Sequence, residues 1–138
     1  MSVTTLRGIA PGTASIWIGR ALGATVTLFL LFDGGIKLLD LSVVRQTLEH
    51  LGYSADVDRF LGALTVAIAV LYAWPRTSVP GAILLTGLLG GAMATHLRVA
   101  SPLFSHTLFG LYLGMMAWGS LFLRYPRVRT LLSLDRPD

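Results

Sequence analysis

An acidic and a basic side chain stand four residues apart inside an otherwise apolar stretch of this 138-residue chain. They are Asp33 and Lys37, in the segment FDGGIK at residues 32–37. A spacing of four places both on one face of a helix, where they can form an ion pair. A carboxylate beside an ammonium stays charged and can accept hydrogen bonds from a ligand. The pair is a candidate binding site for the polar end of a ligand, although mutual neutralisation near a membrane surface would also explain it.

Two histidines follow at the ends of later apolar stretches. His96 closes the segment GAMATHL, directly after Thr95, and His106 lies in the segment SHT. An imidazole can donate or accept a proton near neutral pH, so Asp33 and His96 are candidate catalytic acid and base groups. Lys37, Thr95 and His106 join them as candidate ligand-binding residues. Each histidine is also close enough to a helix end to be simply hydrated.

A metal site is not predicted around these histidines. Neither one is followed, three or four residues later, by the acidic residue or second histidine that is typical of metal-binding helices. The chain contains no cysteine, which removes thiolate ligands, thiol nucleophiles and disulfides.

Four apolar segments must position these side chains. They cover approximately residues 16–39, 57–74, 79–97 and 104–123, and each is near the ~20 residues that a helix needs to cross a bilayer. Hydrophobic residues make up 54% of the chain, charged residues 13%, and the mean hydropathy is +0.69. A soluble domain of this size could not bury so much apolar surface. We therefore expect an all-α polytopic membrane protein, an antiparallel bundle of four transmembrane helices surrounded by the lipid bilayer.

The connection between the first and second spans is expected to contain a short amphipathic helix. Leu41, Val44, Leu48 and Leu51 recur there at helical spacing, with charged residues between them. Such a helix lies on the membrane surface or over the mouth of the bundle. Because Asp33, Lys37, His96 and His106 would then share one depth near the outer leaflet, the topology predicts one polar site.

Basic residues predict the orientation in the membrane. Most arginines fall in residues 1–15, in the connection after the second span and in residues 124–138. The positive-inside rule then places both termini in the cytoplasm, as tails of a multi-pass protein in the inner (plasma) membrane of the cell. Residues 1–15 lack the apolar core of a signal peptide, so the first span is expected to remain uncleaved.

Three pairs of glycines indicate close helix packing. Each pair is separated by three residues, the spacing that lets membrane helices approach closely. The pairs are Gly19 with Gly23, Gly87 with Gly91, and Gly110 with Gly114. We expect these pairs to pack within the bundle; an interface with a second copy or with another membrane protein is the alternative.

Motifs for several other functions are absent from the sequence. It contains no phosphate-binding loop, no serine triad and no dinucleotide fingerprint. The basic C-terminal residues fit anionic lipid better than nucleic acid, so no nucleic-acid partner is expected.

Several of these segments together resemble the DoxX-like family of small four-helix membrane proteins. They are FDGGIKL, LGYSADVDRFLGAL, the turn after a Trp-Pro, and GGAMATHL followed by a proline. The resemblance extends over approximately Trp17 to Leu123. Many relatives carry a glutamate after the Leu-Gly of the second helix, whereas residues 61–65 here read LGALT and contain no carboxylate. A role of that glutamate is therefore not transferred.

The resemblance also implies functions. The family takes its name from a subunit of a quinol oxidase, and relatives are linked to membrane redox complexes, to stress responses and to receptor assembly. It thus implies an accessory of a membrane redox system that binds a quinone or another flat lipophilic molecule, with Asp33, Lys37 and His96 at its polar end. Two alternatives stay open: a membrane-embedded isomerase or cyclase that uses Asp33 and His96, and an assembly factor for another membrane protein.

Overall fold

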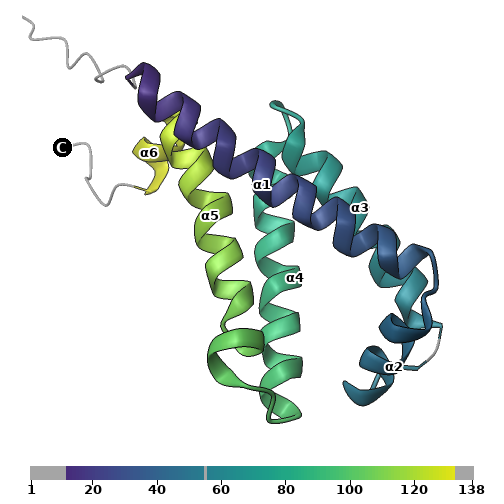
Figure 1. Ribbon diagram of the computed structural model, residues 1–138. Coiled ribbons are helices and arrows are strands. Elements are labelled where there is room, and N and C mark those ends of the chain that lie inside the picture. The colour runs from purple at the N-terminus through teal and green to yellow at the C-terminus, as the bar shows by residue number, and fades with distance from the viewer. Residues whose placement is uncertain (1–11, 55, 133–138) are drawn as a thin grey trace, which may run out of the picture.

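The computed structural model describes residues 12–54 and 56–132, and all regular structure within these ranges is helical. The helices are α1 (Thr13–Leu38), α2 (Ser42–His50), α3 (Val57–Ala73), α4 (Ser78–Arg98), the π-helical turn η1 (Leu103–Thr107), α5 (Phe109–Arg124) and α6 (Pro126–Leu132) (Figure 1). The predicted all-α class is confirmed. Residues 1–11 of the predicted N-terminal tail and 133–138 of the C-terminal one lie outside the described residues, whereas residues 126–132 form α6.

Three helical segments are long and apolar enough to cross a membrane: α1, α4, and residues Leu103–Arg124, which comprise η1 and α5. Helix α3 has 17 residues. At 1.5 Å per residue it is about 25 Å long, somewhat less than a typical hydrocarbon core. The apolar segment at 57–74 is thus helical as expected, while its role as a fourth span stays a prediction.

The four long helices pack in a ring. Helix α1 contacts α3 and α5, and α4 contacts the same two neighbours, so α1 and α4 occupy opposite corners. Figure 1 shows α4 and α5 side by side with α1 crossing them, and the C-terminal ends of α1 and α4 spread apart toward the end that carries α2. Space between the helices therefore widens at the end where the candidate residues were predicted.

Glycines set the two closest approaches of α1. A Cβ atom on Gly62 of α3 would lie 2.9 Å from the carbonyl oxygen of Gly34, so the two backbones touch at this crossing. Near the other end of α1, a Cβ atom on Gly23 would lie 2.7 Å from the Ser120 hydroxyl of α5. That hydroxyl donates a hydrogen bond to the carbonyl oxygen of Gly19, at 2.7 Å. Helix α1 is held against α3 and α5 by backbone proximity that only small residues allow.

The three predicted glycine pairs have different outcomes. Packing within the bundle is confirmed for Gly19 with Gly23, against α5, and for Gly110 with Gly114, against α4. A Cβ atom on Gly110 would lie 2.8 Å from Met93, and one on Gly114 would lie 3.7 Å from Leu89. It is wrong for Gly87 and Gly91, because a Cβ atom at either position would meet no atom within 4 Å. These two glycines leave space open instead of closing it.

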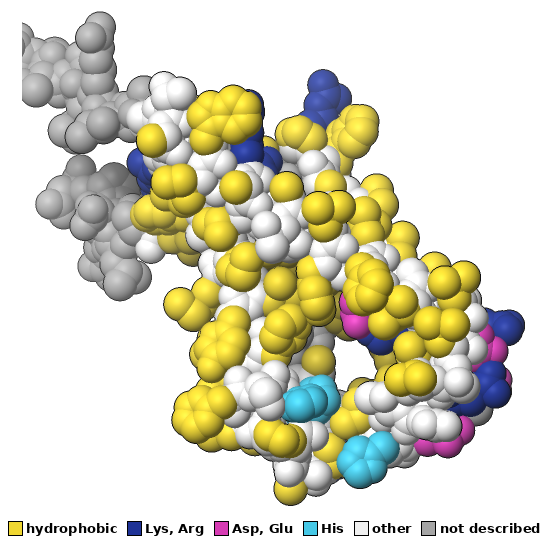
Figure 2. All heavy atoms as spheres, viewed as in Figure 1, with side chains coloured by type: hydrophobic (Ala, Val, Ile, Leu, Met, Phe, Trp, Pro, Cys, Tyr) yellow, Lys and Arg dark blue, Asp and Glu magenta, His cyan; other side chains and the backbone are white. Residues whose placement is uncertain are grey.

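Apolar side chains are spread over the face shown in Figure 2 as well as filling the interior. Val26, Leu30 and Leu121 are fully buried in the core, whereas Trp17 and Leu28 are mostly exposed. A surface of this kind is stable in hydrocarbon, where an exposed leucine has no cost. On the face shown in Figure 2, acidic side chains gather at the end that carries α2, and the other end shows only basic ones.

Candidate functional site

A cavity of about 620 Å³ lies between the four long helices, with α2 at one side. Its walls are mainly apolar and include Phe29 of α1, Leu64 and Ile68 of α3, Leu88 of α4 and Leu113 of α5. Gly87 and Gly91 also line it, and because they carry no side chains they leave the α4 wall open. The volume falls within the range of small-molecule sites in proteins.

One end of this cavity is polar. Asp33 and Lys37 line it from α1, and Thr95 and His96 line it from α4. Asp33 and Lys37 form the expected ion pair. Figure 2 shows the corresponding hollow, with acidic and basic side chains on one rim and a histidine on another. The structure therefore brings together four of the five candidate residues from two helices at opposite corners of the ring. Their functional roles stay predictions.

Hydrogen bonds fix the α4 side of the polar end. The Thr95 hydroxyl donates to the Gly91 carbonyl oxygen at 2.9 Å, and its oxygen lies 3.0 Å from the Tyr53 hydroxyl. Since Thr95 has a single hydroxyl proton, Tyr53 is the donor in that second bond, which leaves the Tyr53 oxygen as an acceptor. The Nδ1 atom of His96 lies 3.1 Å from the Ser101 hydroxyl. Its Nε2 atom is thus the nitrogen that remains for a ligand.

His106, the fifth candidate, does not line the cavity. Its side chain is exposed on η1, with Nδ1 2.7 Å from the Ser105 hydroxyl. Its ring centre lies 5.9 Å from that of His96. Within the described residues, no three His, Asp or Glu side chains gather as metal ligands. The structure therefore places His106 beside the candidate site, on its outer side.

A family model described as DoxX-like family matches residues 21–120 of the 138. The chain belongs to the DoxX-like family. No curated protein and no solved structure matches it. The matched region contains every residue that lines the cavity, and together with the three apolar helices of spanning length it makes this DoxX-like chain a membrane protein in contact with the lipid bilayer.

The cavity of this DoxX-like protein also includes residues that were not predicted. Tyr53 lines the polar end, and Leu48 and Leu51 line the adjacent wall. Arg98 of α4 holds the end of α2 in place, because its Nη2 donates to the Leu51 carbonyl oxygen at 2.8 Å. The helical spacing of Leu48 and Leu51 indicated an apolar face, but Leu41, at the start of the same pattern, is 45% exposed. No pattern in the sequence indicated the Tyr53–Thr95 hydrogen bond.

Proposed function

We propose that this DoxX-like protein binds a lipophilic small molecule with a flat, uncharged polar head, such as a quinone, and serves as an accessory of a membrane redox system. The observation that carries the proposal is a cavity with apolar walls and one polar end. Four of the candidate residues line that end, and every lining residue belongs to the part of the chain that the family model matches. Lipophilic cofactor sites have this composition: many apolar contacts and a few polar groups that orient the ligand.

The charge of the polar end favours an uncharged head. Asp33 and Lys37 neutralise each other, and a charged ligand would leave one charge unpaired next to hydrocarbon, which is costly. Lys37 has further N–H donors, and Nε2 of His96 can donate to a carbonyl oxygen or accept from a hydroxyl group. A head that carries carbonyl or hydroxyl oxygens matches both sides of the cavity.

Replacement of His96 tests the proposal. We expect the purified protein to bind a quinol analogue saturably in lipid nanodiscs and His96→Ala to weaken the affinity at least about tenfold, or about 1.4 kcal/mol. The matched control is His50→Ala, because His50 is exposed on α2 and does not line the cavity. Equal affinities of the wild type and His96→Ala would discard this site.

An acid/base enzyme is the second candidate. Asp33 and His96 line the same cavity from different helices, as the acid and base of an isomerase or cyclase would. Turnover of a lipophilic substrate by the purified protein, without added partners, would support this candidate. A pH profile of that turnover unchanged by His96→Ala would count against it.

An assembly role, with a membrane-protein partner or a second copy, would use a different surface. A groove of about 330 Å³ between α4 and α5 is lined by Gly90, Gly114 and Met115 and is almost wholly apolar. Loss of a stoichiometric partner in Gly90→Leu would favour this role over ligand binding.

The membrane topology completes the proposal. We infer four spans with both termini in the cytoplasm of a plasma-membrane protein and α2 at the outer surface. The support is the distribution of charge along the helices. Arg20, Arg76 and Arg124 belong to one end of the bundle (Figure 1), which has no acidic residue within 12–54 and 56–132. At the other end the acidic residues offset the basic ones, which are Lys37, Arg45, Arg59 and Arg98. Reporter fusions at the C-terminus distinguish the two orientations.

A further inference from the structure

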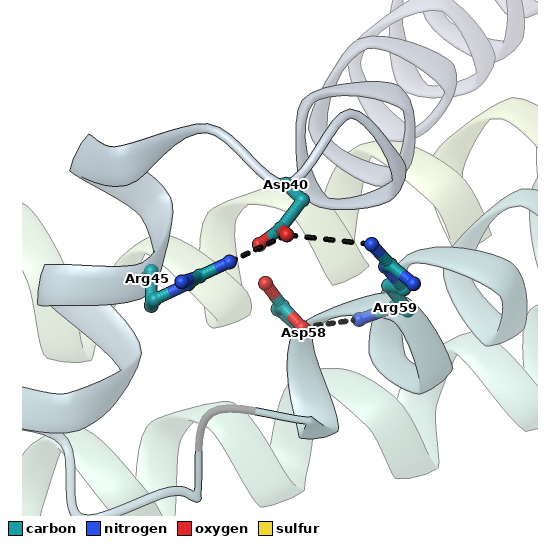
Figure 3. Close-up of polar contacts among 4 residues, drawn as sticks. All are labelled: Asp40, Arg45, Asp58 and Arg59. Atoms are coloured by element: carbon teal, nitrogen blue, oxygen red, sulfur yellow. Dashed lines mark hydrogen bonds and ion pairs between the residues drawn. The ribbon is translucent and has the colours of Figure 1, made fainter.

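Four charged side chains join the α1–α2 connection to the start of α3, outside the candidate ligand site. They are Asp40, Arg45, Asp58 and Arg59 (Figure 3). Arg45 and Arg59 both donate to Oδ2 of Asp40, Arg59 at 3.4 Å. Oδ1 of Asp58 accepts the backbone N–H of Arg59 at 2.8 Å. Each carboxylate thus has one oxygen engaged.

The second oxygen of each carboxylate has no partner. Oδ1 of Asp40 and Oδ2 of Asp58 are both buried without a hydrogen bond, and the Asp58 residue is only 2% exposed. In Figure 3 the free oxygen of Asp58 points toward the carboxylate of Asp40. A buried ionised oxygen without a donor is costly, and two that face each other also repel. Something that both oxygens can bind would remove this cost.

The charges around these two oxygens, Oδ1 of Asp40 and Oδ2 of Asp58, favour a positive species between the two carboxyl groups. From α2, Arg45 and Glu49 face the cluster, and from the start of α3, Asp56, Asp58 and Arg59 do so. Lys37, which precedes the connection, is paired with Asp33. The cluster therefore contains more acidic than basic groups. A proton shared by two carboxyl groups is the smallest species that relieves this imbalance.

The cluster lies at the N-terminal end of a segment that borders the cavity. We call residues 41–51 the strap. Its boundaries, Asp40 and Gly52, both have left-handed backbone conformations, with φ of 54° and 84°. At its far end the strap is held by the bond from Arg98 to Leu51. Leu48 and Leu51 are its buried residues, and both line the cavity. A segment with so few buried side chains opens locally at low cost.

We propose that Asp40 and Asp58 share one proton and that this proton fastens the strap against α3 and over the cavity. The hydrogen bond from Arg45 lowers the pKa of Asp40, and Arg59 also donates to Asp40, so Asp40 is the ionised partner. We place the shared proton on Oδ2 of Asp58 because that buried oxygen has no donor. The Asp58 carboxyl group then donates from Oδ2 to Oδ1 of Asp40. When the pH rises, the proton leaves to solvent, two carboxylates face each other, and the strap loosens.

Amide hydrogen exchange of residues 41–51 tests the proposal on the full chain in nanodiscs, without ligand. Protection factors, which correct for the pH dependence of intrinsic exchange, should be at least about tenfold higher at about pH 5 than at about pH 9, both above the usual Asp pKa. In Asp58→Asn, the amide N–H₂ replaces the acid as a permanent donor, so the protection should be high at both pH values. Asp56→Asn is the matched control: Asp56 lines the same pocket but is exposed, and the variant should keep the pH dependence.

Three results would overturn the proposal. The first is equal protection of the wild-type strap at both pH values, which decides the question even where Asp58→Asn fails to fold. The second is a folded Asp58→Asn whose strap is unprotected at about pH 5. The third is loss of the protection at about pH 5 when metal ions are removed with a chelator, since a metal ion would then occupy the place assigned to the proton. Because no ligand is present in this experiment, its outcome is independent of whether the cavity binds a quinone.

Discussion

Replacing Gly91 by leucine should block the cavity without disturbing the bundle. A Cβ atom at Gly91 meets nothing within 4 Å, and the residue lines the 620 Å³ cavity. A leucine side chain adds four carbon atoms, about 100 Å³ at protein packing density, which is roughly a sixth of that volume. Next to Thr95 and His96 this addition occupies space that a ligand head needs. We expect affinity for a quinol analogue to fall at least about tenfold, or about 1.4 kcal/mol.

The stability of the same variant should be unchanged or slightly raised, because leucine favours a helix over glycine by about 0.5 to 1 kcal/mol. Gly90→Leu is the matched control on the same helix: its Cβ also meets nothing within 4 Å, but it lines the separate α4–α5 groove. Titration of both variants with the quinol analogue in nanodiscs measures the affinity. Thermal unfolding of the same samples shows whether a loss of affinity comes from a loss of stability. Undiminished binding by a folded Gly91→Leu, or an equal loss in Gly90→Leu, would refute the assignment of the cavity as the ligand site.

Two further predictions concern the packing that shapes the cavity. Gly62→Ala should lower the free energy of unfolding by about 1 to 3 kcal/mol in denaturant titrations, because the added Cβ lies 2.9 Å from the Gly34 carbonyl oxygen. Gly35→Ala is the control: its Cβ meets no atom within 4 Å, so this variant should not lower the free energy of unfolding. Equal stability of the two variants would contradict the close α1–α3 crossing. Tyr72→Phe should cost about 0.6 to 1.7 kcal/mol, because the buried Tyr72 hydroxyl donates to the Ala117 carbonyl oxygen at 2.9 Å. The exposed Tyr112→Phe provides the comparison, and a Tyr72→Phe variant as stable as it would show that this bond contributes nothing.

The helices could be predicted because hydrophobic length is a strong signal in a membrane protein. The predicted segments 16–39, 57–74, 79–97 and 104–123 agree with α1, α3, α4 and η1 with α5 to within a few residues. The arrangement of these helices in space is harder to predict, because apolar helices have similar compositions. The opposite placement of α1 and α4 depends on contacts of individual residues, such as Gly34 with Gly62, and Gly62 was not singled out from the sequence.

The candidate site was predicted where local spacing was sufficient. The i,i+4 spacing fixed the Asp33–Lys37 pair, and the alternating direction of the helices placed Thr95 and His96 at the same end. Tyr53 was missed because its bond to Thr95 spans 42 residues and depends on how the strap folds back. The partnerless oxygens of Asp40 and Asp58 were missed for the same reason: no periodicity relates a residue in a connection to one in the first turn of a helix.

Glycine has two opposite effects in this bundle, and together they produce the cavity. On α1 and α3, Gly34 and Gly62 bring backbones into contact, so the position of α1 is set by its neighbours α3 and α5. On α4, Gly87 and Gly91 have no neighbour to contact, because α1 lies at the opposite corner of the ring. If close packing were the only role of small residues here, all four glycines would be expected at contacts. Two of them instead line the cavity between Asp33 and His96, and an unfilled space in a core costs packing energy. Binding of a lipophilic molecule there, as we propose, would restore the missing contacts.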